Sequence, residues 1–202
     1  MTYIGRFAPS PTGPLHFGSL ITAVASYCDA KANQGTWLVR IEDTDIPRIY
    51  PNSESHILDC IDAFEFEPDA DIIFQKNRLD LYEQVLEQLK QAQQIYACEC
   101  TRKQLGSNHI YVGTCRDLHL DFLNQAIRLK VDDQLICFDD LLQGRQCSNL
   151  KNDLGDFVLK RRDGIISYQL AVVVDDYLQG STHVVRGADL LDNTARQTWL
   201  GC

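Results

Sequence analysis

A single segment near the start of the chain joins a predicted strand to a predicted helix through a short turn. Residues 3–8 have the composition of a strand, and residues 15–32 have the apolar spacing of a helix. The turn between them contains Pro9, Pro11, Gly13 and Pro14. Where a strand passes directly into a helix, unpaired backbone N–H groups and the helix dipole both favour an anion. The segment therefore predicts a phosphate site at the N-terminal end of the helix.

The residues at the start of this helix are suited to a bound ligand. Gly18 lets the backbone approach a ligand closely, and His16 adds a polar hydrogen-bonding group. Two simpler interpretations stay open at this point. The segment can be an ordinary turn of another nucleotide-binding fold, and His16 can be a loop residue that only caps the helix.

The charge balance limits the classes of partner. With 19 Lys and Arg against 28 Asp and Glu, the net charge is −9, which argues against general affinity for DNA or RNA. An RNA partner must therefore contact a local basic patch. The candidates are Arg102 and Lys103 with Arg116, and residues 160–162. A solvated charged surface is the alternative interpretation of both.

No segment of the sequence is expected to enter a membrane. The N-terminus has no basic region followed by an apolar block, and the longest aliphatic run, residues 171–174, is far too short to cross a bilayer. At 202 residues, 45% apolar and 23% charged, the chain is expected to form one globular domain, or one with an insertion. We expect a cytoplasmic protein.

Alternating strand and helix patterns predict the fold. Strand-like runs are expected at residues 3–8, 36–41, 71–74, 126–131, 134–138, 157–160 and 183–186. Helical runs are expected at residues 15–32, 53–66, 78–92 and from about residue 188 onward. Such alternation favours a parallel sheet whose ligand site lies beyond the carboxyl ends of its strands. The predicted fold class is therefore α/β, a Rossmann-like parallel sheet with helical crossovers, and the irregular pattern of residues 98–155 indicates an inserted α+β segment.

The eight cysteines argue against a disulfide framework, because the chain is expected in the cytoplasm. Cys28 and Cys60 lie within apolar helical patterns and are expected in the core. Cys137 and Cys147 have no recognisable partner pattern.

Three other cysteines have the spacing of a metal site. Cys98 and Cys100 are separated by one residue, and Cys115 follows after a loop. This spacing resembles a structural zinc site that lacks one ligand. By spacing alone, His109 or His119 is the natural fourth ligand, and a group of inert thiols is the alternative interpretation.

The order of residues in the first segment resembles the first signature of class I aminoacyl-tRNA synthetases, which reads here His16-Phe17-Gly18-Ser19. The preceding run, Arg6-Phe7-Ala8-Pro9-Ser10-Pro11-Thr12-Gly13, is similar to that of the glutamate-activating branch. The resemblance implies that His16, Gly18 and Ser19 act in catalysis at the helix start, where phosphoryl oxygens are held as charge redistributes.

A glutamate pocket needs arginines and a carboxylate, because glutamate carries two carboxylates and one ammonium. Arg6 and Arg186, near the ends of predicted strands, are suited to the carboxylates, and Glu42 is suited to the ammonium. The contacts that the resemblance implies are Arg6, Phe7, Ala8, Pro9, Ser10, Glu42, Tyr168 and Arg186. Taken singly, Arg186 can be a surface ion pair, Tyr168 a core aromatic residue and Glu42 a solvated strand end.

Two further patterns resemble the glutamyl-queuosine tRNA(Asp) synthetases within this branch. One is Cys-x-Cys with a later Tyr-x-x-x-Cys, and the other is the run Val-Arg-Gly-Ala-Asp-Leu-Leu at residues 185–191. The resemblance implies that the tyrosine oxygen is the fourth zinc ligand, so the implied set is Cys98, Cys100, Tyr111 and Cys115. It also implies one structural Zn²⁺ and ATP as a substrate with Mg²⁺.

The implied reaction is tRNA-independent activation of L-glutamate by ATP to glutamyl-adenylate. Transfer to the queuosine base at the wobble position of tRNA(Asp) then follows. Two alternatives remain, namely a catalytic fragment of an ordinary glutamyl-tRNA synthetase and an inactive remnant that binds zinc or tRNA.

The resemblance divides the chain into three parts. Residues 1–97 are expected to form the first half of the catalytic domain, residues 98–155 an inserted zinc-binding, acceptor-type subdomain, and residues 156–202 the second half. The family's lysine-rich second signature, which neutralises the outer ATP phosphates, is not found in this sequence. On that ground we expect the 202-residue product to be impaired or inactive. The family's last sheet strand is missing as well, which would expose a strand edge and the apolar side of the final helix, so we also expect poor solubility.

Overall fold

The computed structural model describes residues 2–105 and 110–201, and it divides into two compact units. The first unit contains Met1–Leu79 and Asp175–Leu191, and the second contains Asp80–Val174 and Asp192–Cys202. His109, one of the expected metal ligands, lies outside the described residues.

The first unit is built on a parallel four-stranded sheet with the order β3-β2-β1-β9. Its strands are β1 (Ile4–Phe7), β2 (Thr36–Ile41), β3 (Ile73–Phe74) and β9 (His183–Val184). Its helices are α1 (Phe17–Ala32), α2 (Ser53–Ala63) and the 3₁₀ turns η1 (Ile46–Arg48), η2 (Gln75–Arg78) and η4 (Ala188–Leu190). The prediction of an α/β fold with a parallel sheet and helical crossovers is confirmed in this unit.

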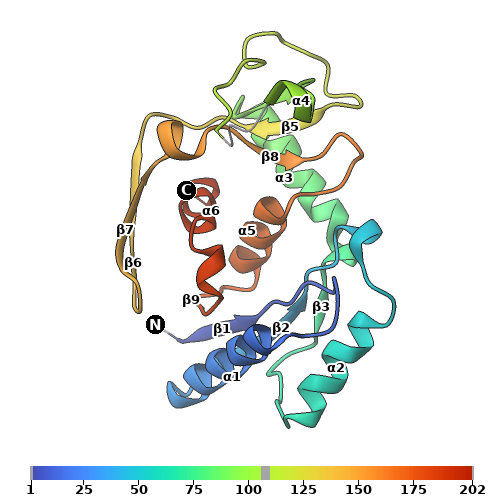
Figure 1. Ribbon diagram of the computed structural model, residues 1–202, viewed down its shortest axis with the longest axis vertical. Helices are drawn as coiled ribbons and strands as arrows, with labels where there is room; N and C mark the ends of the chain where they lie inside the picture. Colours follow the sequence, from blue (N-terminus) through green and yellow to red (C-terminus); the bar gives the residue numbers. More distant parts are fainter. Residues whose placement is uncertain (1, 106–109, 202) are drawn as a thin grey trace. The chain divides into compact units, whose positions relative to one another are not determined.

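The two faces of this sheet carry different side chains. Successive residues of a strand point to opposite faces, so Trp37, Val39 and Ile41 lie on one face of β2. These three are buried in a core shared with residues of α1 and α2, and Figure 1 shows both helices beside the blue strands. Leu38 and Arg40 therefore lie on the opposite face, which becomes the polar face of the unit.

The second unit contains an antiparallel sheet with the order β4-β5-β8 and a separate hairpin. Its strands are β4 (Ile95–Cys98), β5 (Ala126–Leu129), β6 (Leu135–Asp140), β7 (Gly144–Asn149) and β8 (Phe157–Lys160). Its helices are α3 (Leu79–Gln91), α4 (Arg102–Leu105), the π-helical η3 (Leu150–Leu154) and α6 (Asn193–Leu200). Helix α5 (Tyr168–Leu178) starts in this unit and ends in the first one.

Several predicted boundaries differ from the structure for local reasons. Strand β4 and strand β7 were not expected, and β7 pairs with β6 through a tight antiparallel hairpin. Helix α2 ends at Ala63, three residues earlier than predicted. Glu65 adopts a left-handed φ of 54°, and the Phe66 N–H donates to the Ile61 carbonyl, which together close the helix with a Schellman motif.

Two cysteine predictions were wrong. A disulfide joins Cys137 to Cys147, which face each other across the β6–β7 hairpin. The sequence offered no sign of the pairing, because it depends on the register of the two strands. Cys28 is exposed on α1, although its apolar neighbours favoured a core position.

Among the helices of the described ranges, none combines the length and the apolar character that a membrane crossing requires.

Candidate active site

Three of the expected glutamate contacts lie at the carboxyl edge of the parallel sheet. Arg6 is the third residue of β1, Glu42 follows the last residue of β2, and Arg186 lies two residues beyond β9. Because β1 is hydrogen-bonded to both β2 and β9, the three residues come from adjacent strands. The first unit thus brings together two arginines and one acid. Tyr168 is the first residue of α5 and belongs to the second unit, so its position is given only within that unit.

The proline-rich turn after β1 is held in place by backbone hydrogen bonds. The Glu42 N–H donates to the Pro9 carbonyl at 2.9 Å, and the Tyr50 N–H donates to the Pro11 carbonyl at 2.9 Å. The Ser53 hydroxyl at the start of α2 also donates to the Pro11 carbonyl, at 2.6 Å. These bonds tie the turn to the end of β2 and to α2, so it is a fixed element of the sheet edge.

The side chains of the predicted Arg6–Ser10 run have different surroundings. Phe7 is buried in the core, where its ring stacks on Trp37 with 6.4 Å between centroids. Pro9 is buried, Ala8 is half-buried and Ser10 is exposed. The run therefore offers Arg6, Ser10 and backbone groups to a ligand, while Phe7 supports the turn from the core.

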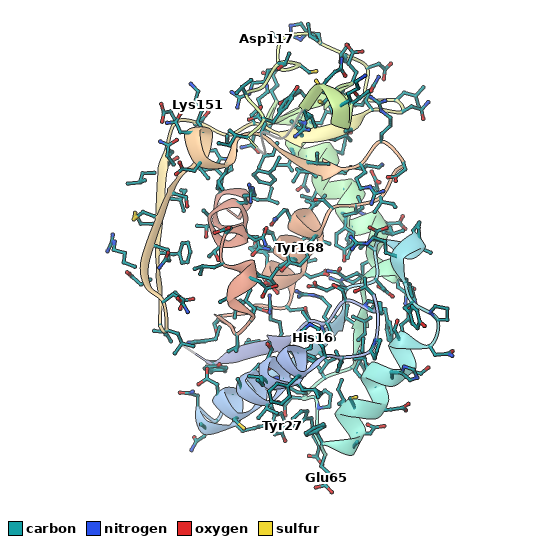
Figure 2. All side chains as sticks on the ribbon, in the orientation of Figure 1. His16, Tyr27, Glu65, Asp117, Lys151 and Tyr168 are labelled. Atoms are coloured by element: carbon teal, nitrogen blue, oxygen red, sulfur yellow. A yellow bond between two sulfur atoms is a disulfide. The ribbon has the colours of Figure 1, made fainter. Side chains whose placement is uncertain are left out.

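His16 is the N-cap of α1 (Figure 2). Its Nδ1 accepts the Ser19 N–H at 3.2 Å, and its Nε2 lies 3.2 Å from Ser19 Oγ. A Cβ atom placed on Gly18 would meet His16 Cε1 at 3.1 Å, so glycine leaves room for the ring. His16 is exposed, so it caps the helix and also presents its ring to solvent at the expected phosphate site.

A buried charge network on the polar face of the sheet was not predicted. Arg40 is fully buried, and its guanidinium lies 2.8 Å from Asp176 Oδ1, 3.3 Å from Glu42 Oε1 and 3.8 Å from Asp175 Oδ2. Asp176 also accepts from Arg6, with Oδ1 3.1 Å from Nε and Oδ2 3.3 Å from Nη2. An arginine inside the otherwise apolar run of β2, and two acids directly after residues 171–174, were the signals in the sequence that could have found it.

The network shifts the pKa values of two of its three acids, Glu42 and Asp176, in opposite directions. Burial raises the pKa of the Glu42 carboxyl, and the nearby Arg40 and Arg6 only partly oppose this. For Asp176, burial also acts to raise the pKa, but the charges and hydrogen bonds of Arg6 and Arg40 outweigh it and lower the pKa. Asp176 is therefore firmly ionised at neutral pH.

The second unit brings the predicted zinc ligands together. The sulfur atoms of Cys98, Cys100 and Cys115 all lie within 4.8 Å of one another, with Cys100 Sγ and Cys115 Sγ 3.4 Å apart. The Tyr111 hydroxyl oxygen lies 3.4 Å from Cys98 Sγ and 3.4 Å from Cys100 Sγ. Among the described residues, His119 does not belong to this group.

Neighbouring residues fix the tyrosine and the loop that carries it. The Cys115 N–H donates to the Tyr111 hydroxyl at 3.0 Å, and the Arg128 guanidinium lies 3.9 Å from the centre of the Tyr111 ring. Buried Asp156 accepts from the Tyr96 hydroxyl at 2.5 Å and from Arg116 Nε at 2.6 Å. The cluster is thus supported from both sides by hydrogen-bonded, buried polar groups.

Three of the six residues in the predicted basic patches, Arg116, Lys160 and Arg161, form ion pairs within the second unit. Arg116 is paired with Asp156, and Lys160 is paired with Glu83 at 2.6 Å. Arg161 is paired with Asp163, and Arg162 donates to the Glu99 carbonyl at 2.8 Å. The side chain of Arg102 lies outside the described part of the chain.

The chain matches a known protein family over nearly its whole length. The family model "tRNA synthetases class I (E and Q), catalytic domain" matches residues 4–201. A glutamyl-Q tRNA(Asp) synthetase of Acinetobacter baylyi is 80% identical over 98% of this chain and 68% of its own length. The protein of the same name from Cupriavidus metallidurans is 52% identical, with the same coverage.

A solved structure shares the fold. The crystal structure of a glutamate tRNA ligase from Elizabethkingia meningosepticum, in complex with its amino acid, superimposes with a TM-score of 0.87 at 30% identity. This chain is covered over 99% of its length but spans only 46% of that structure. Both kinds of relative place the matched region within class I synthetase catalytic domains. The chain belongs to the glutamyl-Q tRNA(Asp) synthetase family of class I tRNA synthetases, which are ligases.

Proposed function

We propose that this protein activates L-glutamate with ATP, without tRNA, and transfers the glutamate to the queuosine base at the wobble position of tRNA(Asp). The observation that carries the proposal is the 80% identity to a glutamyl-Q tRNA(Asp) synthetase over 98% of the chain. The arrangement of Arg6, Glu42 and Arg186 at one sheet edge supports the amino-acid part of it.

The proposed pocket matches the charges of glutamate. Arg6 and Arg186 supply guanidinium groups for the two carboxylates, and Glu42 supplies a carboxylate for the ammonium. Two Arg6 nitrogens already bind Asp176, which leaves its Nη1 for a substrate oxygen. A guanidinium with one fixed edge presents the other in a defined direction, so it selects a carboxylate over an amide.

The proposed first step is an in-line displacement at phosphorus. A glutamate α-carboxylate oxygen attacks the α-phosphorus of ATP, the bond from that phosphorus to the bridging oxygen breaks, and pyrophosphate leaves with the electron pair. Because two anions must meet, catalysis consists mainly of positioning and charge stabilisation. His16 and the N–H groups at the start of α1 are placed to bind phosphoryl oxygens, and Mg²⁺ would accompany ATP as part of the substrate.

The thiol cluster fits one structural zinc ion. A tetrahedral site with three thiolates and one oxygen has edges of about 3.5 to 3.8 Å. The distances of 3.4 Å from Tyr111 Oη to two sulfurs, and between Cys100 and Cys115, are close to these edges. Cys98, Cys100, Tyr111 and Cys115 would hold the ion, which would cross-link the loop to β4.

One assay separates the candidate functions. The protein is incubated with ATP, labelled glutamate and one of three RNAs, namely tRNA(Asp) with queuosine, tRNA(Asp) with guanine at the same position, or tRNA(Glu). Label on the first RNA alone supports the proposal. Label on tRNA(Glu) indicates an ordinary glutamyl-tRNA synthetase, and no label on any RNA contradicts both transfer activities.

The pocket itself is tested by binding. Isothermal titration calorimetry of the wild-type protein should show tighter binding of glutamate than of glutamine, and Arg186→Glu should lose that preference. Equal affinities in the wild type, or a harmless charge reversal at position 186, would contradict the proposed pocket.

A further inference from the structure

We infer that Asp176 is a positioning residue for the glutamate site, because its carboxylate aligns Arg6 and links it through Arg40 to Glu42. This inference rests on the proposed function, since it concerns the same site. Asp176 does not need to touch the substrate for this role. It acts through the arginine that does.

The strand register explains why one carboxylate can reach two arginines. Arg6 on β1 is paired with Leu38 on β2, and Arg40 is two residues further along β2. Since side chains alternate along a strand, Arg6 and Arg40 lie on the same face of neighbouring strands. Asp176, near the end of α5, contacts both, at 3.1 Å from Arg6 Nε and 2.8 Å from Arg40 Nη1.

These contacts form a continuous chain of charges across the site. Its order is Arg6, Asp176, Arg40, Glu42, with alternating sign at every step. One end is the proposed partner of a substrate carboxylate, and the other end is the proposed partner of the ammonium. Asp176 therefore fixes the distance between Arg6 and Glu42, the two groups that are proposed to bind the same amino acid.

Burial of these side chains strengthens the contacts by which Asp176 aligns Arg6. Arg6 is 4% exposed, Arg40 is fully buried and Asp176 is 20% exposed, so water screens the contacts weakly. Two further contacts restrain the same face, because Gln179 Oε1 accepts from Arg40 Nη1 at 2.7 Å and Asp175 accepts from Arg78 Nε at 2.8 Å. Removal of the Asp176 charge would take the ion-pair partner from buried Arg6 and let its guanidinium reorient, whereas Arg40 would keep Glu42 and Gln179.

The test compares Asp176→Asn with wild type by glutamate-dependent pyrophosphate exchange. We expect the KM for glutamate to rise at least tenfold, the KM for ATP to change less than threefold, and kcat to fall less than the glutamate KM rises. Asp176→Glu keeps the charge and should recover part of the loss. Asp69→Asn is the matched control, because Asp69 makes an ion pair with Lys31 in the same unit, outside the site, and its loss should leave both KM values unchanged.

A second measurement is independent of activity. In ¹⁵N-labelled protein, the Arg6 Nε–H signal, assigned by its loss in Arg6→Lys, should exchange slowly with water in wild type and rapidly in Asp176→Asn. If Asp176→Asn does not fold, both measurements are made on Asp176→Glu instead. The expected results are then a smaller rise in the KM for glutamate and a shifted Arg6 Nε–H signal.

The outcomes separate this inference from the proposed function. Unchanged glutamate KM and unchanged Arg6 exchange in the Asp176 variants would overturn the inference, as would equal rises in both KM values. If the wild type shows no glutamate-dependent exchange while Arg6 protection still depends on Asp176, the proposed function fails and the positioning role stands.

Discussion

The Tyr111 hydroxyl oxygen lies 3.4 Å from the sulfur of Cys98, although the two residues are 13 positions apart in the chain. The Arg128 guanidinium lies over the ring of the same tyrosine, and the Cys115 N–H donates to its oxygen. These two contacts hold the ring in place with its oxygen beside the thiols. Of the candidates for a fourth ligand that the structure describes, Tyr111 lies against the thiols and His119 is not in their group.

We therefore expect Tyr111→Phe to weaken zinc binding by more than about tenfold, because it removes one of four ligands. Zinc content per chain, measured by atomic emission after dialysis against a weak chelator, should fall from near one to well below one. Tyr177→Phe is the matched control, since Tyr177 is 83% exposed on α5. A wild-type protein purified with zinc supplementation that holds no zinc would contradict the proposed site.

We expect His16→Asn to separate capping from catalysis. Asparagine is a good N-cap, so the free energy of unfolding should change by less than about 0.5 kcal/mol. The imidazole that faces the proposed phosphate site is lost, so pyrophosphate exchange should fall by about 10²- to 10³-fold. His56→Asn, an exposed substitution on α2, provides the control. Full activity in His16→Asn would show that His16 only caps its helix.

The lowered pKa of Asp176 predicts a pH dependence of stability. A carboxylate whose pKa lies lower in the folded than in the unfolded state stabilises the fold above its unfolded pKa and loses that effect as the pH falls through its folded pKa. Here the unfolded pKa is that of an ordinary aspartate side chain, about 3.9, and the folded pKa of Asp176 lies below it. We expect the unfolding free energy of wild type, measured by urea denaturation from pH 5 to pH 2.5, to fall more steeply than that of Asp176→Asn. Parallel curves for the two proteins would show that the acid is not ion-paired in solution.

The disulfide between Cys137 and Cys147 predicts a redox-dependent stability. The bond closes a loop with a sequence separation of 10, and the loss of such a loop costs about 2 to 3 kcal/mol by the chain-entropy account. Reduction, or Cys137→Ser with Cys147→Ser, should lower the unfolding free energy by up to that amount, while Cys28→Ser should have little effect. Peptide mapping without reductant should recover residues 137 and 147 in one linked product. Recovery of two free thiols from air-oxidised protein would contradict the pairing.

Local sequence signals predicted those features that depend on neighbours in the chain. Strand β2 at Thr36–Ile41 and strand β8 at Phe157–Lys160 have the predicted bounds, because each is an apolar run with clear breaks at both ends. The parallel α/β sheet is confirmed. The glutamate contacts and the zinc ligands remain predictions, and the structure shows where each of their described members lies.

Long-range pairing could not be read in the same way. Strand β7 has the composition of a loop, Gly144–Asn149, and is a strand only because β6 pairs with it. The Cys137–Cys147 bond follows from that register. A pattern of apolar residues contains no information about a polar segment that becomes a strand through hydrogen bonds to its neighbour.

By itself, the sequence determined the strand–turn–helix segment, the alternation that builds a parallel sheet, and the spacing of three thiols. These follow from steric and hydrophobic preferences of residues close together in the chain. Only the tertiary structure decided that Asp176 binds Arg6 from 170 residues away and that Arg40 contacts all three acids of the network. Such contacts form only after a helix packs on the polar face of the sheet. The charged side chains there are largely shielded from water, so each one pairs with an opposite charge.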